Sequence, residues 1–472
     1  MDSVVENQEN KSPKISMKTY GCKVNTYDSG LLQDKLKKAG IENSLNKDVH
    51  IVNTCAVTRE ATMEALRHIR KMKKNNPDSL VVVTGCAAQV DSDDFVNEKA
   101  ADFIIANSHK FSMNELLTEK LEGKSEERLK HSNIFEKDDL DAEGGLEEGR
   151  SRAFVKIQDG CNSFCTYCVI PFARGKSRSI PIPGVIDKVN ELSSKGFAEG
   201  ILTGIHIGDY ASVKSAEDKL KVVSARGRTN PDRYYFLEDL IEQVLEHTEM
   251  PRFRLGSIEP GELSERLLKT YANPRMCPHF HMSIQSACSK TLKGMKRKYD
   301  AKLVEKSLKD IQRLVPNAYV GMDVIVGFPG ETEEDFNETF QRLASLPWTR
   351  IHVFPYSDRP GTKSEEYCEK VDTVEKKRRA SLLRELSSQR LREQALAQIG
   401  SLKDCILLSK YKDKSKVQVL SRDYWQMQLI NLPEDFDLER IAEGEFKVKV
   451  VSFDESNASR MDGKLLAELV ES

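Results

Sequence analysis

The feature that most constrains this chain is a set of three closely spaced cysteines directly after a β-rich run. Cys161, Cys165 and Cys168 stand in a C-x3-C-x2-C pattern. Three thiolates can hold three irons of a cubic iron–sulfur cluster and leave the fourth iron open for a small molecule. A structural zinc site would need a fourth protein ligand nearby, and no Cys or His follows closely to supply one. The odd number and the tight spacing argue against disulfides. The pattern therefore favours a cluster with an open iron.

The composition is that of an ordinary globular chain. Its 472 residues suggest roughly three domains, and its formal net charge of -2 argues neither for nor against a nucleic-acid partner. Ten cysteines are too few for a disulfide scaffold of this size, and without a signal peptide they are interpreted as reduced thiols or metal ligands. No apolar run reaches the roughly 18 residues that span a bilayer. We therefore expect a cytoplasmic protein with no membrane partner.

Residues 14–125 are predicted to form an N-terminal domain in which short β-rich runs alternate with helical stretches. This rhythm is typical of a parallel sheet in a doubly wound α/β layer. Cys22, Cys55 and Cys86 each follow one of the first three predicted strands. Because parallel strands place their carboxyl ends at one edge of the sheet, we expect the three thiols to converge and hold a second cluster. The alternative is three unrelated core residues, since free cysteine is often buried. The predicted strands cover residues 15–20, 50–53, 80–84 and 103–106.

The β/α rhythm resumes over residues 151–370, after an acidic stretch at 126–150 that is predicted to be a flexible linker. Six strand–helix units suggest a partial (β/α)6 barrel whose chemistry lies at the carboxyl ends of the strands. The loop that begins at Cys161 follows the first of these strands and so belongs to that edge. The predicted strands cover residues 153–158, 200–204, 252–257, 279–285, 319–327 and 350–355.

Other strand ends of this barrel carry residues suited to gripping a nucleoside-bearing cofactor. Glycine there lets the backbone approach a ligand closely, and hydroxyl, amide or carboxylate groups can bond a ribose or an amino-acid moiety. Turn glycines and helix caps are the alternative at each position, and only the shared edge favours binding. Cys277, His279 and His281 suggest a metal site, but a structural or substrate-facing role is favoured. The strand-end candidates are Thr203, Gly204, Ser257, Glu259, Gln285, Ser286 and Gly327.

The C-terminal part divides into a charged connecting helix at 371–398 and a small β-barrel at 399–470. Short runs of alternating apolar residues predict the barrel. Positive charge mixed with aromatic rings suits nucleic acid, because bases stack on such rings. The candidate RNA contacts are Lys410, Lys412, Lys414, Lys416, Arg422, Tyr424 and Trp425.

Several motifs resemble a known family. The cysteine triplet with Tyr167 before its third cysteine resembles the radical S-adenosylmethionine (SAM) enzymes. The runs TYGCKVN at 19–25, NTCAVT at 53–58 and TGCA at 84–87 are similar to those of the methylthiotransferases, which attach a methylthio group to an unactivated carbon. The runs at 202–210 and 351–357 most resemble the branch that acts on threonylcarbamoyladenosine in tRNA, beside the anticodon. The terminal barrel is similar to the TRAM module of RNA-modifying enzymes.

The resemblance implies two 4Fe-4S clusters and SAM as cofactors. The C-x3-C-x2-C cysteines would hold the cluster whose open iron binds SAM, and the radical made there would act at adenine C2. The second cluster, held by Cys22, Cys55 and Cys86, would carry the sulfur that a second SAM methylates. The implied SAM contacts are Tyr167, Thr203, Gly204, Ser257, Gln285, Gly327 and Phe354.

The implied function is conversion of N6-threonylcarbamoyladenosine to its 2-methylthio derivative in tRNA. Its partners would be the tRNA anticodon stem-loop, an electron donor such as flavodoxin or ferredoxin, and a sulfur donor. Methylthiolation of isopentenyladenosine in tRNA is the runner-up. Methylthiolation of a ribosomal protein fits the motifs at 202–210 and 351–357 less well. A non-catalytic or electron-transfer iron–sulfur protein is a further alternative, but it leaves the barrel rim and the terminal barrel without a purpose.

Overall fold

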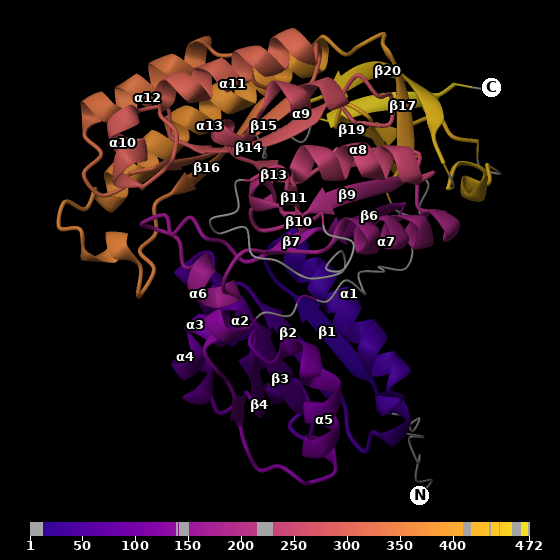
Figure 1. Cartoon of the computed structure of the whole chain (residues 1–472), viewed down its shortest axis with the longest axis vertical. Coiled ribbons are helices and arrows are strands. Elements are labelled where there is room, and N and C mark those ends of the chain that lie inside the picture. The colour runs from indigo at the N-terminus through magenta and orange to yellow at the C-terminus, as the bar shows by residue number, and fades with distance from the viewer. Residues whose placement is uncertain are drawn as a thin grey trace, which may run out of the picture. The chain divides into compact units, whose positions relative to one another are not determined.

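The structure, a computed structural model, describes residues 13–137, 140, 151–214, 230–408, 417–433, 436–442, 444–455 and 464–470. The chain divides into two units (Figure 1). The first comprises Met1–Glu136 together with Phe172–Arg174, and the second comprises Lys137–Pro171 together with Gly175–Ser472. The short segment Phe172–Arg174 therefore belongs to the first unit, although the sequence predicts it within the central barrel domain.

A five-stranded parallel sheet forms the first unit, with its strands in sequential order from β1 to β5 (Figure 1). On one face, Leu32 and Leu36 of α1 pack with Val49 and Ile51 of β2. Successive residues of β2, β3 and β4 are nearly all buried, so both faces of the sheet are covered. This confirms the predicted α/β domain. Its elements are β1 (Ile15–Thr19), α1 (Lys23–Lys38), η1 (Ile41–Ser44), β2 (Val49–Thr54), α2 (Arg59–Asn75), β3 (Leu80–Gly85), α3 (Cys86–Val90), α4 (Ser92–Val96), β4 (Phe103–Ala106), η2 (Lys110–Ser112), α5 (Met113–Leu121), β5 (Leu129–Lys130) and η3 (Ile134–Glu136).

Strand β5 lies inside the stretch that the sequence predicts as a flexible linker. Its two residues pair in parallel with Ile104 and Ile105 of β4. The Arg128 guanidinium donates to the carbonyls of Ala101 and Val96 and anchors the strand. A two-residue strand is too short to leave a period of two in the sequence, so only the backbone pairing reveals it. Residues 138–139 and 141–150 of the predicted linker lie outside the described residues.

Strands with intervening helices build the central part of the second unit. β6, β9 and β12 pair as one parallel sheet, and β13 to β16 pair as another. Only Gly256 separates β12 from β13, so the two sheets form a partial barrel, as predicted (Figure 1). The elements are β6 (Arg152–Lys156), β7 (Gln158–Asp159), α6 (Ile170–Arg174), β8 (Arg178–Ser179), α7 (Ile182–Ser194), β9 (Glu199–Thr203), η4 (Ile207–Asp209), β10 (Ser212–Val213), β11 (Tyr234–Tyr235), α8 (Leu237–His247), β12 (Arg252–Leu255), β13 (Ser257–Ile258), η5 (Pro260–Glu262), α9 (Glu265–Thr270), β14 (His279–Gln285), α10 (Ser289–Gly294), α11 (Ala301–Leu314), β15 (Tyr319–Val326), α12 (Glu333–Ser345), β16 (Arg350–Pro355) and η6 (Lys363–Glu366).

The strands β14, β15 and β16 have one apolar face and one polar face. Met282 of β14 and Val324 of β15 belong to the core that the helices cover. The alternate residues His281, Asp323 and His352 are only half-buried. Because successive residues of a strand point to opposite faces, these three polar side chains share the face that is turned away from the helices.

A closed barrel of strands β17 to β21 follows the long helix α13 and confirms the predicted C-terminal β-barrel. Its core includes Trp425 and extends to Leu391 of α13 and Tyr319 of β15. The elements are α13 (Thr373–Leu396), β17 (Leu402–Leu407), β18 (Gln418–Ser421), β19 (Gln426–Leu429), η8 (Leu438–Ile441), β20 (Phe446–Asp454) and β21 (Lys464–Leu469).

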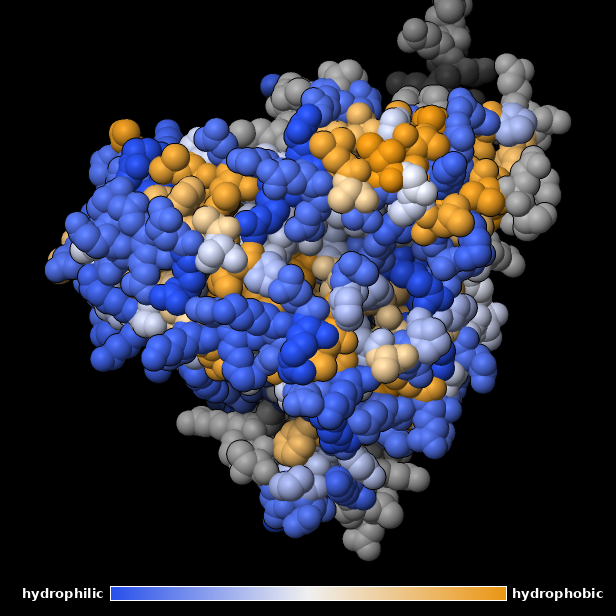
Figure 2. All heavy atoms as spheres, turned by 90° about the horizontal axis from the view of Figure 1, so that it is seen from above, coloured by the Kyte–Doolittle hydropathy of each residue, from blue (hydrophilic) through white to orange (hydrophobic). Residues whose placement is uncertain are grey.

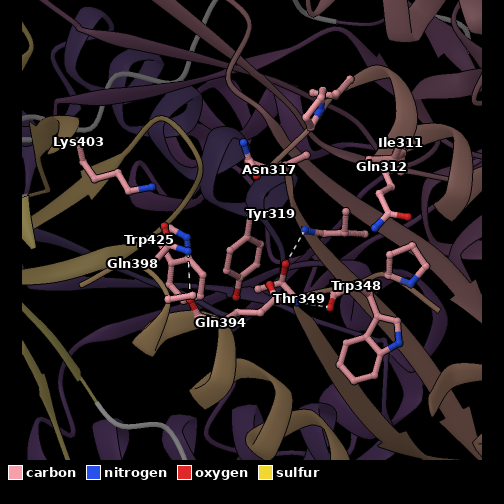
Figure 3. A pocket seen from close by; sticks show the side chains of 16 residues that line it. Ile311, Gln312, Asn317, Tyr319, Trp348, Thr349, Gln394, Gln398, Lys403 and Trp425 are labelled. Carbon is pink, nitrogen blue, oxygen red and sulfur yellow. Dashed lines mark hydrogen bonds between the residues drawn. The ribbon is translucent and has the colours of Figure 1, made fainter. Parts of the chain in front are cut away.

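A cavity of about 630 Å³ lies where the terminal barrel meets the amino ends of β15 and β16. Figure 3 shows Tyr319 between Trp425 on one side and Trp348 on the other. Thr349, which precedes β16, accepts a hydrogen bond from the Val320 backbone N–H at 3.1 Å. Because the cavity adjoins the amino ends of these strands, it lies at the opposite end of β15 from the edge where the sequence predicts the chemistry.

Most large apolar side chains are buried in the cores of the sheet and the barrels. The face drawn in Figure 2 is largely hydrophilic, with apolar residues in separate patches. Of the helices that the structure describes, none is long and apolar enough to cross a membrane. The large apolar side chains that are exposed are Val57, Phe172, Phe354, Val374, Leu396, Ile399 and Leu402.

A buried ion network joins the terminal barrel to the central strands. Glu199 at the start of β9 accepts hydrogen bonds from Arg252 at 2.7 Å and from Arg254 at 3.0 Å, and all three side chains are buried. Arg252 also donates to Glu445 at 3.0 Å, and Arg254 donates to the carbonyl of Arg422 at 3.2 Å. Burial alone would raise the pKa of Glu199, but Arg254 and Arg252 hold it well below its usual range. Glu199 therefore compensates the two arginines that hold the barrel.

We predict that Glu199→Gln loosens the terminal barrel. Removing one partner of a buried ion pair costs about 3–5 kcal/mol, because the remaining charges are left uncompensated. The urea concentration at the unfolding midpoint should fall, and limited proteolysis should cleave near residues 397–401, between α13 and β17. Glu246→Gln, at an exposed position of α8, is the control and should change stability by less than about 0.5 kcal/mol. Equal stability of the two variants would contradict this role of Glu199.

Candidate functional site

The three cysteines of the first unit, here called the Cys22 group, lie at the carboxyl edge of its sheet. Cys22 follows β1 and precedes α1, Cys55 follows β2, and Cys86 begins α3 directly after β3. Cys55 and Cys86 are buried, and Cys22 is exposed. The Cys55 Sγ lies against Gly21, which precedes Cys22, and Asn25, which follows Cys22 by three residues, lies 3.9 Å from the Cys86 Sγ. The structure therefore brings together cysteines that lie 33 and 31 residues apart in the sequence.

Gly21 makes room for one of these sulfurs. Its φ of +97° falls in the left-handed region that favours glycine. A Cβ at this position would lie 2.8 Å from the Cys55 Sγ. The turn after β1 therefore requires glycine immediately before Cys22, both for its backbone conformation and for the space that the neighbouring sulfur occupies.

Asn25 ties the loops of the Cys22 group together. This buried side chain stands in the first turn of α1. Its Nδ2 donates to the carbonyls of Tyr20 and Thr54, each at 2.9 Å. Its Oδ1 lies 3.9 Å from the Cys86 Sγ. One amide therefore contacts all three loops that carry the cysteines, which it can do because it both donates and accepts.

Three buried charged side chains lie beside Asn25. The Arg174 guanidinium donates to Asn25 Oδ1 at 2.6 Å and to Asp28 Oδ2 at 3.2 Å. Lys110 Nζ contacts the same Asp28 carboxylate at 3.1 Å. All three charged groups are almost fully buried. The two cations and the carboxylate thus form a buried ion cluster next to the Cys22 group.

Burial disfavours the charged form of these thiols. It raises the pKa of Cys55 to about 12, and the neighbouring Cys86 adds to the rise. Arg174 acts on the Cys55 pKa in the opposite direction. A thiol that is protonated at neutral pH is a poor nucleophile, whereas a bound metal displaces the proton and takes the thiolate. The environment therefore suits metal ligands better than a free nucleophile.

The second set, here called the Cys161 group and made of Cys161, Cys165 and Cys168, stands on the loop after β7. The Cys168 N–H donates to the Cys165 carbonyl at 3.0 Å, which closes the loop into a turn. Gly160 precedes Cys161 with φ +75°, and a Cβ there would lie 2.0 Å from the Lys176 carbonyl oxygen. Only glycine allows the chain to pass so close. The loop lies at the carboxyl end of the first barrel strand, where the sequence predicts it.

Gln158 ties the Cys161 group to the next strand end. This buried side chain donates through Nε2 to the Gly160 carbonyl at 2.7 Å. Its Oε1 accepts from the backbone N–H groups of Ile205 and His206, at 3.0 and 2.8 Å. A Cβ on Gly204 would lie 2.8 Å from the same Oε1. Gln158 is thus one group that requires glycine at this position, and contact of Gly204 with SAM stays a prediction.

Arg297 places a positive charge beside the Cys161 group. Its Nη1 lies 3.0 Å from the Cys165 Sγ and 3.4 Å from the Tyr167 hydroxyl. Its Nη2 pairs with the Glu259 carboxylate at 2.6 Å. Burial raises the pKa of Cys168 to about 12, Cys165 adds to the rise, and Arg297 opposes it. Both groups of cysteines thus combine buried thiols with a nearby guanidinium.

His206 lies beside the thiol of Cys161. Its Nδ1 lies 3.7 Å from the Cys161 Sγ. Its Nε2 pairs with Glu262 and lies 3.5 Å from Glu259. Burial alone would lower the His206 pKa, but hydrogen bonds to Asp209, Cys161 and Glu262 raise it well above its ordinary value. A protonated His206 therefore balances the carboxylates around the Cys161 group.

Several predicted SAM contacts share the strand-end edge with the Cys161 group. Thr203 ends β9 and is buried, Gln285 ends β14, and Tyr167 stands in the cysteine loop. Phe354 lies near the end of β16 and is exposed. Ser257 begins β13 and is also exposed. Contact of these residues with SAM stays a prediction.

Gly327 packs against a helix. A Cβ there would lie 2.2 Å from the Lys376 Cγ of α13. The Gly327 N–H donates to the Glu331 carboxylate at 2.9 Å, and Arg379 of α13 pairs with the same carboxylate at 2.6 Å. Glycine is thus required here because its missing side chain accommodates Lys376, and contact of Gly327 with SAM stays a prediction.

Two predicted RNA contacts have partners inside the protein. Trp425 is only 7% exposed and packs edge-on against Tyr319, with ring centroids 5.2 Å apart. Arg422 pairs with Glu445 and donates to the Pro274 carbonyl. The predicted stacking role of Trp425 is corrected, because its ring belongs to the core that joins the barrel to β15. The remaining candidates Lys410, Lys412, Lys414 and Lys416 lie outside the described residues.

The two histidines of the stretch 277–281 have different surroundings. His279 stacks on Tyr424 of the terminal barrel, with ring centroids 3.9 Å apart. His281 Nε2 lies 3.0 Å from the Asp323 carboxylate. The structure thus agrees with the structural or substrate-facing role that the sequence favours for this stretch over a metal site.

The side chains that organise both groups of cysteines could not be identified as such from their residue types. Asn25 stands three residues after Cys22, and Gln158 stands three residues before Cys161. Their closeness in the sequence to a cysteine motif is the one signal that could have identified Asn25 and Gln158 as site residues. Arg174 and Arg297 carry no such signal. Each group of cysteines offers three thiols, the donor set that holds three irons of a cubane cluster and leaves one open.

Comparison with known proteins agrees with this arrangement. Residues 14–106 match the family described as "Uncharacterized protein family UPF0004", and residues 155–343 match the radical SAM superfamily. The threonylcarbamoyladenosine tRNA methylthiotransferase MtaB of Aquifex aeolicus is 35% identical over 385 residues, which cover 80% of this chain and 89% of that protein. The tRNA-2-methylthio-N(6)-dimethylallyladenosine synthase of Desulfotalea psychrophila is 32% identical over 369 residues, which cover 75% of this chain and 79% of that protein.

A solved structure shares the fold. The radical SAM methyltransferase TsrM of Kitasatospora setae, with cobalamin and a 4Fe-4S cluster bound, superposes with a TM-score of 0.53 at 12% identity, covering 83% of this chain and 77% of that one. The cofactors that follow for this chain are SAM and iron–sulfur clusters, and the three-thiol donor sets fit the clusters. The chain belongs to the methylthiotransferase family of radical SAM enzymes.

Proposed function

We propose that the protein converts N6-threonylcarbamoyladenosine in tRNA to its 2-methylthio derivative. The observation that carries the proposal is that each unit has three cysteine thiols at the carboxyl ends of parallel strands. Methylthio transfer needs both an activated carbon and a sulfur to place on it, and two separate sites match these two needs. The relatives named for this reaction, at 32–35% identity, support the choice of substrate.

In this proposal the Cys161 group holds the 4Fe-4S cluster that binds SAM, and the Cys22 group holds the cluster that supplies the sulfur. Such clusters, when bound, supply electron transfer and an open iron that takes a ligand. The protein supplies orientation and electrostatics. Asn25 and Gln158 fix the loops of the two groups, and Arg297 offsets negative charge at the Cys161 group.

Polar side chains near the proposed site favour threonylcarbamoyladenosine over its isopentenyl analogue. The threonyl group carries a carboxylate and a hydroxyl, whereas the dimethylallyl group is apolar. His281, Asp323 and His352 occupy the open face of β14, β15 and β16, and Arg297 and His206 stand at the strand ends. Isopentenyladenosine stays the second candidate, because the dimethylallyladenosine synthase of Desulfotalea psychrophila is also 32% identical. In either case we expect a tRNA anticodon stem-loop, an electron donor and a sulfur donor as partners.

Nucleoside analysis of tRNA tests the proposed substrate. Cells that lack this protein should lose 2-methylthio-threonylcarbamoyladenosine and accumulate threonylcarbamoyladenosine, because the methylthio step is missing. The wild-type gene should restore the modification, and the Cys161→Ala variant should not. The exposed Cys368→Ala is the matched cysteine control and should restore it fully. Loss of the isopentenyl analogue instead would select the second candidate, and unchanged tRNA would refute both.

Iron content tests the assignment of the two groups. Anaerobically reconstituted protein should hold about eight irons, as two cubanes. Replacing all cysteines of the Cys161 group by alanine should leave about four, and so should replacing all cysteines of the Cys22 group, because each group holds one cluster. Cys368→Ala should keep about eight. Full retention in either triple variant would show that the iron has other ligands.

Cluster retention should depend on pH. The thiols of Cys55 and Cys168 have pKa values of about 12, so between pH 7 and 9 each is protonated before the cluster forms and loses a proton when it does. Raising the pH over this range therefore favours the loaded protein. Iron retained against an iron chelator, with the affinity of the chelator measured at each pH, should increase from pH 7 to pH 9. Retention that stays flat or falls would argue against these thiols as ligands.

A further inference from the structure

We propose that Arg174 is a positioning residue for the cluster of the Cys22 group and that its charge raises the reduction potential of that cluster. This inference rests on the proposed function, because it takes the Cys22 group to hold an iron–sulfur cluster. Arg174 stands six residues after Cys168 in the sequence, yet it belongs to the first unit. The chain thus contributes to the Cys22 group from a segment far along the sequence.

Arg174 fixes the orientation of the Asn25 amide. Arg174 Nη2 donates to Asn25 Oδ1 at 2.6 Å, so the acceptor end of the amide faces the guanidinium. The donor end then faces the carbonyls of Tyr20 and Thr54, each at 2.9 Å. Those carbonyls belong to the loops that carry the first two cysteines. Without the guanidinium, the amide loses the partner that fixes which end faces the two loops.

A second contact from the same segment lies near the third cysteine. The Ala173 carbonyl accepts from Asn107 Nδ2 at 2.9 Å, and the same nitrogen lies 3.6 Å from the Cys86 Sγ. Asn25 Oδ1 lies 3.9 Å from that sulfur. Residues 173 and 174 therefore bind both amides that flank Cys86. Partners of this kind orient metal ligands and commonly affect metal affinity.

The charge balance gives Arg174 its second role. A cubane cluster with three thiolate ligands carries a net negative charge and becomes more negative on reduction. Arg174 and Lys110 both contact the carboxylate of Asp28, at 3.2 and 3.1 Å. Charges interact more strongly in a buried site than in water. The charge of the Arg174 guanidinium, which contacts Asn25 beside the Cys86 sulfur, therefore stabilises the reduced cluster and raises its reduction potential.

A purely structural ion pair does not account for this arrangement. Asp28 already pairs with Lys110, and Arg174 turns the same nitrogen to Asn25 as well. Asn25 Oδ1, which accepts from this guanidinium, lies 3.9 Å from the Cys86 Sγ. The guanidinium is thus one side chain away from a proposed cluster ligand, which an ion pair that served stability alone would not require.

The test uses full-length protein in which Cys161, Cys165 and Cys168 are replaced by alanine, so that iron reports on the Cys22 group. Arg174→Met, Arg174→Lys and Asp28→Asn are compared in this parent after anaerobic reconstitution. Two quantities are measured for each variant. One is the iron retained against a chelator, and the other is the reduction potential from a redox titration followed by electron paramagnetic resonance.

The proposal predicts a different pattern for each variant. Arg174→Met should weaken iron retention about 10–100-fold, as is usual for partners of metal ligands, and should lower the potential. Arg174→Lys keeps the charge and should keep the potential closer to that of the parent. Asp28→Asn removes a negative charge and should raise the potential. Arg67→Gln, at an exposed position of α2, is the matched control and should change neither quantity.

The outcomes separate this inference from the proposed function. If the parent binds no iron, the cluster of the Cys22 group is refuted, and the inference falls with it. If the parent binds iron but Arg174→Met keeps its potential and its iron retention, the inference alone is overturned. If the Arg174→Met variant takes up no iron, its potential cannot be measured, and the potentials of Arg174→Lys and Asp28→Asn then test the role of charge. A potential that rises in Asp28→Asn and is kept in Arg174→Lys supports the role of charge, and unchanged potential in Asp28→Asn overturns it.

Discussion

Parallel pairing of β-strands is the constraint on which both candidate sites depend. In a parallel sheet the strands end at the same edge, so a residue placed after one strand meets residues placed after its neighbours. The first unit uses this edge to assemble the Cys22 group from three separate loops. The second unit places the whole Cys161 group in one loop and takes its partners, Gln158, His206 and Arg297, from around the strand ends. In the first unit this edge brings together the cysteines themselves. In the second unit it brings together the residues that contact the cysteine loop.

Each group of cysteines is matched with one amide and one arginine. Asn25 and Gln158 bond backbone groups of neighbouring loops, which an amide can do because it donates and accepts at once. Arg174 and Arg297 supply positive charge, which buried thiolates need because burial disfavours their charged form. In both units, therefore, an amide holds the cysteine loops in place and an arginine offsets the negative charge of the thiolates.

Local patterns explain what could be predicted from the sequence. Apolar runs mark the strands, and a cysteine directly after a run marks a ligand at the sheet edge, so the fold and both groups of cysteines were predictable. Partners from distant parts of the chain were not, because Arg174 and Asn25 are 149 residues apart and no periodicity relates them. Trp425 was predicted to contact RNA because it lies near lysines in the sequence. The same sequence pattern arises when the ring packs inside the protein, as it does here on Tyr319.

The docking of the terminal barrel limits how it can contribute to RNA binding. Arg252 and Arg254 bind it through Glu445 and a backbone carbonyl, and Tyr424 stacks on His279, so the barrel is a fixed extension of the central strands. Tyr424 and Trp425, which the sequence suggested as stacking surfaces, are used in that interface. If tRNA is the substrate, these two rings therefore contribute indirectly, by fixing the barrel against His279 of β14 and Tyr319 of β15.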